Sequence, residues 1–198
     1  MTATLPTAPP SAVTPRGYFS RVVGIDLSLA STGLAVYYPD GRAAVDSIKT
    51  VGKRGDSLAD RAARIALIAD TVMLWPGTTD LIVVEAPSFG AAGGSTWDRA
   101  GLWWEVVGRS VRLARVATVN PTTRAKWAAG SGRSDKAAVA AAIARRMPNV
   151  DLANSDESDA LALALMGAQW LGWLATSSRV QADAVNGSGA VWPEVPAS

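Results

Sequence analysis

Residues 22–38 read VVGIDLSLASTGLAVYY, the pattern of two β-strands joined by a tight turn. An apolar, partly β-branched run carries one acid, Asp26, into a bend rich in Ser, Thr and Gly, and apolar residues follow the bend. An aspartate is disfavoured inside a strand and is costly to bury without a partner. Asp26 therefore either stabilises the turn with its own side chain or stands where a sheet opens onto a functional site.

The spacing of apolar residues around this stretch predicts an alternation of strands and helices. Strands are expected at residues 21–26, 33–38, 42–50, 80–85 and 116–120, and the turn at residues 39–41 makes the first three an antiparallel meander. Helices are expected from a cap at Asp56 or Ser57 to the stop at Pro76, and at residues 97–114, 122–129, 135–147 and 160–175. This order predicts an α/β fold with a mixed five-stranded sheet and helices on both faces.

A second acid ends another apolar run. Residues 80–85 read DLIVVE, which indicates a strand buried on both faces and parallel to the first, with Glu85 at its end. Functional sites of open α/β sheets gather at the carboxyl ends of parallel strands. Asp26 and Glu85 are therefore expected to face each other across neighbouring strands. Taken alone, Asp26 fits a turn residue better, and Glu85 fits a satisfied carboxylate or a turn residue.

Length and composition limit the class of protein. With 198 residues, 48% of them hydrophobic, we expect one ordered domain at residues 19–175 between a disordered arm at 1–18 and a disordered tail at 176–198. No apolar run of spanning length and no leader pattern is present, which favours the cytoplasm, that of the host if a phage encodes the chain. The absence of Cys and His leaves oxygen ligands, which suit a hard cation such as Mg²⁺ or Mn²⁺.

The positive charge is concentrated in one segment. Residues 98–147 hold ten basic residues against three acidic ones, a net charge of about +7, in a chain whose formal total is +2. The basic residues are Arg99, Arg109, Arg112, Arg115, Arg124, Lys126, Arg133, Lys136, Arg145 and Arg146. Such a segment fits either a nucleic-acid surface or a set of solvated helix faces.

Two short segments place charged residues at helix starts. In GSGRSDK, residues 130–136, Ser134 is a good N-cap, and a lysine just behind it opposes the helix dipole. Lys136 is thus either part of a phosphate site or a solvated lysine. In NSDESD, residues 154–159, Asp156 and Asp159 share a helix face while Glu157 points elsewhere, and the dipole alone would also account for acids at this position.

The helix at 97–114 carries adjacent tryptophans, Trp103 and Trp104, which diverge by about 100° and cannot share one face. One of them is expected to face outward, at a subunit interface or under a loop. Arg109, Arg112 and Arg115 fall three apart, which predicts a basic ridge along the last turns. The preceding Gly- and Ala-rich loop at 87–95 is expected to be mobile.

Four segments together resemble the RuvC family of Holliday-junction resolvases, of phage or actinobacterial type, within the ribonuclease H-like fold. They are GIDLSLASTG at 24–33, LIVVEAPSF at 81–89, GSGRSDK at 130–136 and SDESDALALAL at 155–165. The resemblance spans about residues 22–171. The chain departs from the family pattern at Leu27 and Ser28, where Pro-Gly is common, and in having no histidine near the last acids.

The resemblance implies a set of site residues. Asp26, Glu85, Asp156 and Asp159 match the family's four metal-binding carboxylates, and Lys136 matches a catalytic lysine. Lys126 matches a second basic residue, and Phe89 falls near an aromatic that packs on a base at the junction point. Four acids cannot share a pocket without divalent cations, so two Mg²⁺ per site, replaceable by Mn²⁺, are expected. The bend at residues 28–33 would let the scissile phosphate approach closely.

The implied function is metal-dependent cleavage of branched DNA, preferentially four-way junctions, either in recombination and repair or in the debranching of replicating phage DNA. The expected backbone contacts are Arg109, Arg112, Arg124, Lys126 and Arg133, and the helix at 97–114 is the expected homodimer interface. Alternatives are a ribonuclease H-like nuclease acting on other nucleic acids, a catalytically silent DNA-binding protein, and a sugar-kinase or actin-like ATPase, for which the chain is about half the required length.

Overall fold

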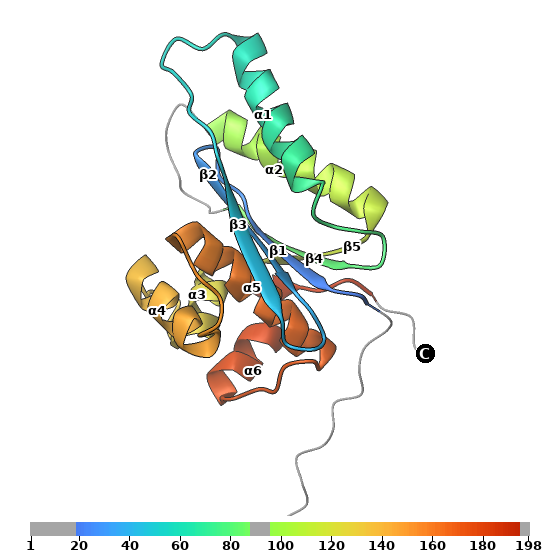
Figure 1. The fold of residues 1–198 in the computed structure, drawn as a ribbon, viewed down its shortest axis with the longest axis vertical. Coiled ribbons are helices and arrows are strands. Elements are labelled where there is room, and N and C mark those ends of the chain that lie inside the picture. Colours follow the sequence, from blue (N-terminus) through green and yellow to red (C-terminus); the bar gives the residue numbers. More distant parts are fainter. Residues whose placement is uncertain (1–18, 88–95, 195–198) are drawn as a thin grey trace, which may run out of the picture.

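The structure is a computed structural model that describes residues 19–87 and 96–194, arranged around one six-stranded mixed sheet (Figure 1). The strand order is β3-β2-β1-β4-β5-β6. Strands β1, β4 and β5 run parallel, whereas β2 and β3 form the predicted antiparallel meander with β1. The strands are β1 (Val22–Asp26), β2 (Ser31–Tyr37), β3 (Ala43–Lys49), β4 (Leu81–Glu85), β5 (Arg115–Val119) and β6 (Ala190–Val191).

Helices cover both faces of the sheet, as the sequence predicts. Helices α1 (Leu58–Val72) and α2 (Thr96–Leu113) pack on one face. Helices α3 (Pro121–Ala129), α4 (Lys136–Arg146), α5 (Ser155–Leu171) and α6 (Arg179–Asn186) pack on the other (Figure 1). Alternate residues of the central strands point to opposite faces, so Val22 faces α5 while Val23 faces α1 and α2. Strand β4 is buried on both faces, which confirms the prediction for DLIVVE.

Helix α5 is the central helix, and from Glu157 to Leu171 every residue is buried. It lies directly on the sheet because glycines stand at the contacts. A Cβ atom added to Gly24 would lie 2.1 Å from the backbone oxygen of Ala160, and one added to Gly33 would lie 2.0 Å from that of Asp156. The close approach brings the start of α5 over the end of β1, where Asp26 stands.

The expected disordered tail from residue 176 is wrong over most of its length. Helix α6 and strand β6 lie there, and β6 pairs with the outer edge of β5. Trp192 stacks on Trp170 with ring centroids 5.0 Å apart and donates a hydrogen bond from Nε1 to the carbonyl of Val185, 2.7 Å away. The Ser-, Gly- and Ala-rich composition suggested disorder, but a few apolar side chains anchor the segment to α5, and β6 makes the sheet six-stranded instead of five-stranded.

Three predicted boundaries also need correction. The side chain of Asp135, not that of Ser134, caps α4, by accepting a hydrogen bond of 2.8 Å from the amide of Ala138. Helix α5 begins at Ser155, so NSDESD opens it as predicted and the acids lie within its first two turns, but it ends at Leu171 rather than at residue 175. Helix α2 ends before Arg115, which begins β5, so the predicted ridge of three arginines does not exist. Within residues 19–87 and 96–194, no helix combines the length and apolarity needed to cross a membrane.

Candidate active site

Two acids stand side by side at one edge of the sheet. Strands β1 and β4 run parallel with Ile25 opposite Val84, so the next residues along them, Asp26 and Glu85, follow at the same edge. Both line a pocket of about 200 Å³ between the strand ends and the beginning of α2. The structure thus brings Asp26 and Glu85 together as the sequence predicts, because the carboxyl ends of parallel strands meet at one edge.

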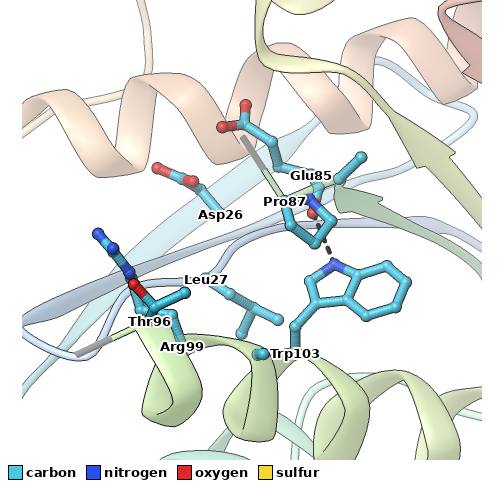
Figure 2. A pocket seen from close by; sticks show the side chains of 9 residues that line it. Asp26, Leu27, Glu85, Pro87, Thr96, Arg99 and Trp103 are labelled. Atoms are coloured by element: carbon cyan, nitrogen blue, oxygen red, sulfur yellow. Dashed lines mark hydrogen bonds between the residues drawn. The ribbon is translucent and has the colours of Figure 1, made fainter. Parts of the chain in front are cut away.

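Helix α2 forms the wall of the pocket opposite the acids (Figure 2). Its residues Thr96, Arg99 and Trp103 line the pocket together with Leu27 and Pro87. The indole Nε1 of Trp103 donates a hydrogen bond of 2.9 Å to the backbone carbonyl of Glu85. Trp103 therefore faces inward and fixes the end of β4, whereas Trp104 is 67% exposed, which confirms that one of the pair faces outward.

The bend after Asp26 is held by its own hydrogen bonds. The hydroxyl of Thr32 donates to the carbonyl of Ser28 over 2.7 Å and accepts from the amide of the same residue over 3.2 Å. Gly33 lies beyond the bend, in β2, and its missing side chain makes room for the backbone of α5 at Asp156. Gly33 therefore serves the packing of α5 on the sheet, and the close approach of a phosphate to the bend at residues 28–33 stays a prediction.

Helix α5 brings two more acids toward the first pair. Asn154 caps the helix by accepting hydrogen bonds of 3.0 Å from the amides of Asp156 and Glu157. The carboxylate of Glu157 is turned away, as predicted, and accepts hydrogen bonds from Ser47 on β3, from the Asn154 side chain and from the amide of residue 153. Glu157 thereby ties the start of α5 to the sheet, which leaves Asp156 and Asp159 to face the edge where Asp26 stands.

Arg124 lies inside this group of acids. It belongs to the first turn of α3, is 8% exposed, and forms ion pairs through Nε with Glu85 and through Nη1 with Asp159. The sequence assigns Arg124 to an exposed DNA-contacting set, and the structure places it in the interior instead. The order of the strands could have indicated this position. Val119 at the end of β5 pairs with Glu85 at the end of β4, so α3, which follows β5, begins at the edge where the acids lie.

Lys136 approaches the acids from the side of α4. It is the first residue of that helix, and its Nζ lies 3.2 Å from Oδ1 of Asp156. Its side chain remains 68% exposed, so it is accessible from solvent. Partial burial disfavours its charge, but the hydrogen bond to Asp156 and the negative charges of Asp156, Asp159 and Asp26 outweigh that effect and raise the pKa of Lys136.

The crowding of acids alters their proton affinity. Burial, followed by the charges of Glu85 and Asp159, raises the pKa of Asp26 to about 8, against the opposing influence of Arg124. Burial also raises the pKa of Asp159 to about 6, although Arg124 acts in the opposite direction. These acids favour a proton or a cation over free ionisation, which is the electrostatic character of a cation-binding site.

The donor set suits a hard divalent cation, since it consists of carboxylate oxygens alone. In the described part of the chain, however, no three acidic side chains stand ready to hold one ion. Two of the four acids are instead bonded to Arg124 and a third is bonded to Lys136. The donor atoms of the site therefore fit Mg²⁺ or Mn²⁺, while three of the four carboxylates are paired with the side chains of Arg124 and Lys136.

The remaining predicted DNA contacts are scattered. Arg109 and Arg112 lie near the far end of α2, which leads into the opposite edge of the sheet, and Arg109 pairs with Asp70 and Glu105. Arg133 is exposed in the loop before Lys136, and Lys126 is partly exposed on α3. Phe89 lies outside the described residues, as do most of the loop expected to be mobile and the N-terminal arm.

Three exposed cations outside the predicted set lie at the end of β3 and in the loop that follows it. Lys49 ends β3 opposite Ser31, at the same edge as Asp26, and the following loop carries Lys53 and Arg54. They fall outside the basic segment at residues 98–147. Their placement becomes visible only when the antiparallel meander returns β3 to the edge where the acids lie.

No protein-family model and no curated protein sequence matches the chain. Among solved structures, it is similar to RuvC of Thermus thermophilus, with a TM-score of 0.56 and 22% sequence identity over 73% of this chain and 91% of that one. It is also similar to T. thermophilus RuvC in complex with a Holliday junction substrate, with a TM-score of 0.54 and 20% identity over 74% and 90% of the two chains. These similarities confirm the predicted RuvC-type, ribonuclease H-like fold.

Proposed function

We propose that this chain is a metal-dependent endonuclease that cleaves branched DNA, preferentially four-way junctions. One observation carries the proposal: on a RuvC-type fold, four carboxylates converge on one edge of the sheet. They are those of Asp26, Glu85, Asp156 and Asp159. One of the similar structures is a RuvC bound to a Holliday junction substrate, which favours branched DNA over other nucleic acids.

The four acids are the groups that would hold the metal, and two ions per site remain our expectation. Bound Mg²⁺ or Mn²⁺ would supply Lewis-acid activation of a water molecule and neutralise charge at the phosphate. Lys136 is suited to contact the phosphate because its ammonium group is exposed beside Asp156. A cation at this place stabilises the negative charge that grows on the phosphate during hydrolysis.

Exposed cations on two sides of the acids would hold the DNA backbone. Lys49, Lys53 and Arg54 lie on the side of β3, and Arg133 and Lys136 lie on the side of α4. Lysine and arginine contacts to phosphates position DNA without reading its sequence. This arrangement suits a substrate recognised by its branched shape.

A homodimer through α2 would place two such sites on a symmetric junction. Trp97, Trp104 and Val111 are 85%, 67% and 58% exposed and follow one another seven residues apart, which forms an apolar stripe along the helix. Trp104→Glu is expected to shift the protein toward monomer in sedimentation velocity, because a buried charge at a subunit interface is strongly unfavourable. An unchanged sedimentation coefficient would exclude this face as the interface.

The deciding experiment is cleavage of a synthetic four-way junction in Mg²⁺ or Mn²⁺. Asp26→Asn keeps the shape of the side chain but removes its charge, so we expect it to abolish cleavage while junction binding in a gel-shift assay persists. Asp183→Asn, which removes an exposed carboxylate on α6, serves as the matched control and should cleave normally. Cleavage in EDTA, or full activity of Asp26→Asn, would refute the proposal.

The same assay separates the alternatives. Tight junction binding by the wild type without cleavage in either metal would identify a catalytically silent DNA-binding protein. Preferential cleavage of RNA or of RNA/DNA hybrids in a substrate panel would assign the chain to another branch of ribonuclease H-like nucleases.

A further inference from the structure

Arg124 is buried, although arginine side chains are mostly exposed at protein surfaces. Its guanidinium group is buried and bonded to carboxylates from two different elements, Glu85 at the end of β4 and Asp159 on α5. The two pairs use different nitrogen atoms, so a single side chain bridges both acids. The contrast with Lys136 is clear, since the lysine pairs with Asp156 while remaining mostly in solvent.

The bridge formed by Arg124 stabilises two buried carboxylates in the metal-free protein. Buried carboxylates without compensating charge are strongly destabilising, and removal of one partner from a buried ion pair exposes that penalty. Arginine is suited to the task because its planar group presents several donors in fixed directions. Arg124 therefore acts as the resident counter-charge that allows Glu85 and Asp159 to stay close together.

The same bridge engages carboxylate oxygens of two of the four acids that would hold a divalent cation. Metal ligands must be ionised, and four ionised carboxylates carry four negative charges, of which Arg124 and Lys136 balance two. One divalent ion neutralises the rest. A second divalent ion would meet an excess of positive charge and would need carboxylate oxygens that Arg124 already engages.

We propose that Arg124 controls metal loading: one divalent ion binds with the arginine bridge in place, and a second binds tightly only when Arg124 leaves Glu85 and Asp159. The inference rests on the proposed metal-dependent function and refines it. It assigns to Arg124 a positioning and competing role toward the metal site, distinct from contact with the DNA backbone.

The test is titration of Mn²⁺ into metal-free protein by isothermal calorimetry, without DNA. The wild type is expected to bind one ion well and a second weakly. In Arg124→Met the second ion should bind more tightly by roughly tenfold or more, which is the scale on which a neighbouring charge alters a site. Metal-free Arg124→Met should also unfold at a lower temperature, and Mn²⁺ should raise its Tm more than it raises that of the wild type.

Arg124→Lys guards against a simple folding defect. Lysine keeps the positive charge but offers one ammonium group instead of a bridging fork, so its second-ion affinity should fall between those of the wild type and Arg124→Met. Arg42→Met is the matched control: it removes an exposed arginine at the β2–β3 turn, which pairs with Asp40. Its isotherm should equal that of the wild type.

The possible outcomes separate the two proposals. Second-ion affinity that is the same in wild type, Arg124→Lys and Arg124→Met would overturn the role of Arg124 while leaving metal dependence intact. Two equally tight ions in the wild type would overturn it as well. Absence of any Mn²⁺ binding by folded wild type would instead refute the metal-dependent function itself.

Discussion

Asp26 combines burial with acidic neighbours, and both make its negative charge unfavourable. The positive charge of Arg124 lowers the pKa of Asp26, but Arg124 forms its ion pairs with Glu85 and Asp159 rather than with Asp26. In the metal-free fold Asp26 is therefore stable as the neutral acid, with its pKa raised to about 8. A metal ligand must be ionised, so cation binding at this residue is linked to loss of a proton.

A pH dependence of stability follows for the metal-free protein. Between the ordinary pKa of 3.8 and about 8, folded Asp26 holds a proton that the unfolded chain has lost. Its contribution to stability is thus complete below about pH 4 and is lost as the pH rises toward 8. The free energy of unfolding should fall relative to Asp26→Asn by up to about 1.4 kcal/mol per pH unit. Urea denaturation in EDTA between pH 5 and 8 measures the difference between the two proteins, and a flat or rising difference would contradict the assignment.

The position of some site residues could be predicted from the sequence, and that of others could not. Asp26 and Glu85 could be placed together because each ends an apolar run in a parallel strand, and Asp156 and Asp159 because helical spacing puts them on one face. Arg124 could not be placed, since a count of charges in a segment does not tell which cation points inward. Only the pairing of β5 with β4 shows that α3 begins beside the acids.

At the scale of elements, the packing of α5 on the sheet decides where its acids stand. Gly24 and Gly33 face backbone atoms of the helix, which cannot move aside as a flexible side chain can. The sequence shows these glycines without showing what lies opposite them. Likewise, the apolar contacts that order α6 and β6 are spread over a segment whose composition suggested disorder.

Substitution of Gly33 tests this packing. A Cβ atom in Gly33→Ala would approach the backbone oxygen of Asp156 to 2.0 Å, so α5 must shift, and overpacking of this kind costs about 1–3 kcal/mol. The shift would also displace Asp156, and weaker Mn²⁺ binding is expected by calorimetry. Gly55→Ala is the control, because nothing lies within 4 Å of its added Cβ atom. If both variants show the same denaturation midpoint and metal affinity, the glycine contact does not position α5.

At the scale of the whole molecule, the fold distributes positive charge unevenly around the sheet. Arg109 and Arg112 belong to the end of α2 that leads to the edge opposite the acids, and Arg109 is already neutralised by Asp70 and Glu105. Lys49 ends β3 at the acidic edge instead, and Lys53 and Arg54 follow in the next loop. The separation of a cation from the acids along the sequence therefore does not tell whether both lie at the same edge of the sheet.

This distribution predicts opposite outcomes for two sets of substitutions. Replacing Lys49, Lys53 and Arg54 by alanine should weaken binding of a four-way junction and lower the salt dependence of the binding constant by about one unit of slope for each phosphate that is no longer neutralised. Replacing Arg109 and Arg112 should leave both quantities near the wild-type values, because their end of α2 lies away from the acidic edge. Fluorescence anisotropy over a series of salt concentrations measures both. The converse result, with the α2 pair dominating the slope, would place the junction on the other side of the molecule and separate DNA binding from the four carboxylates.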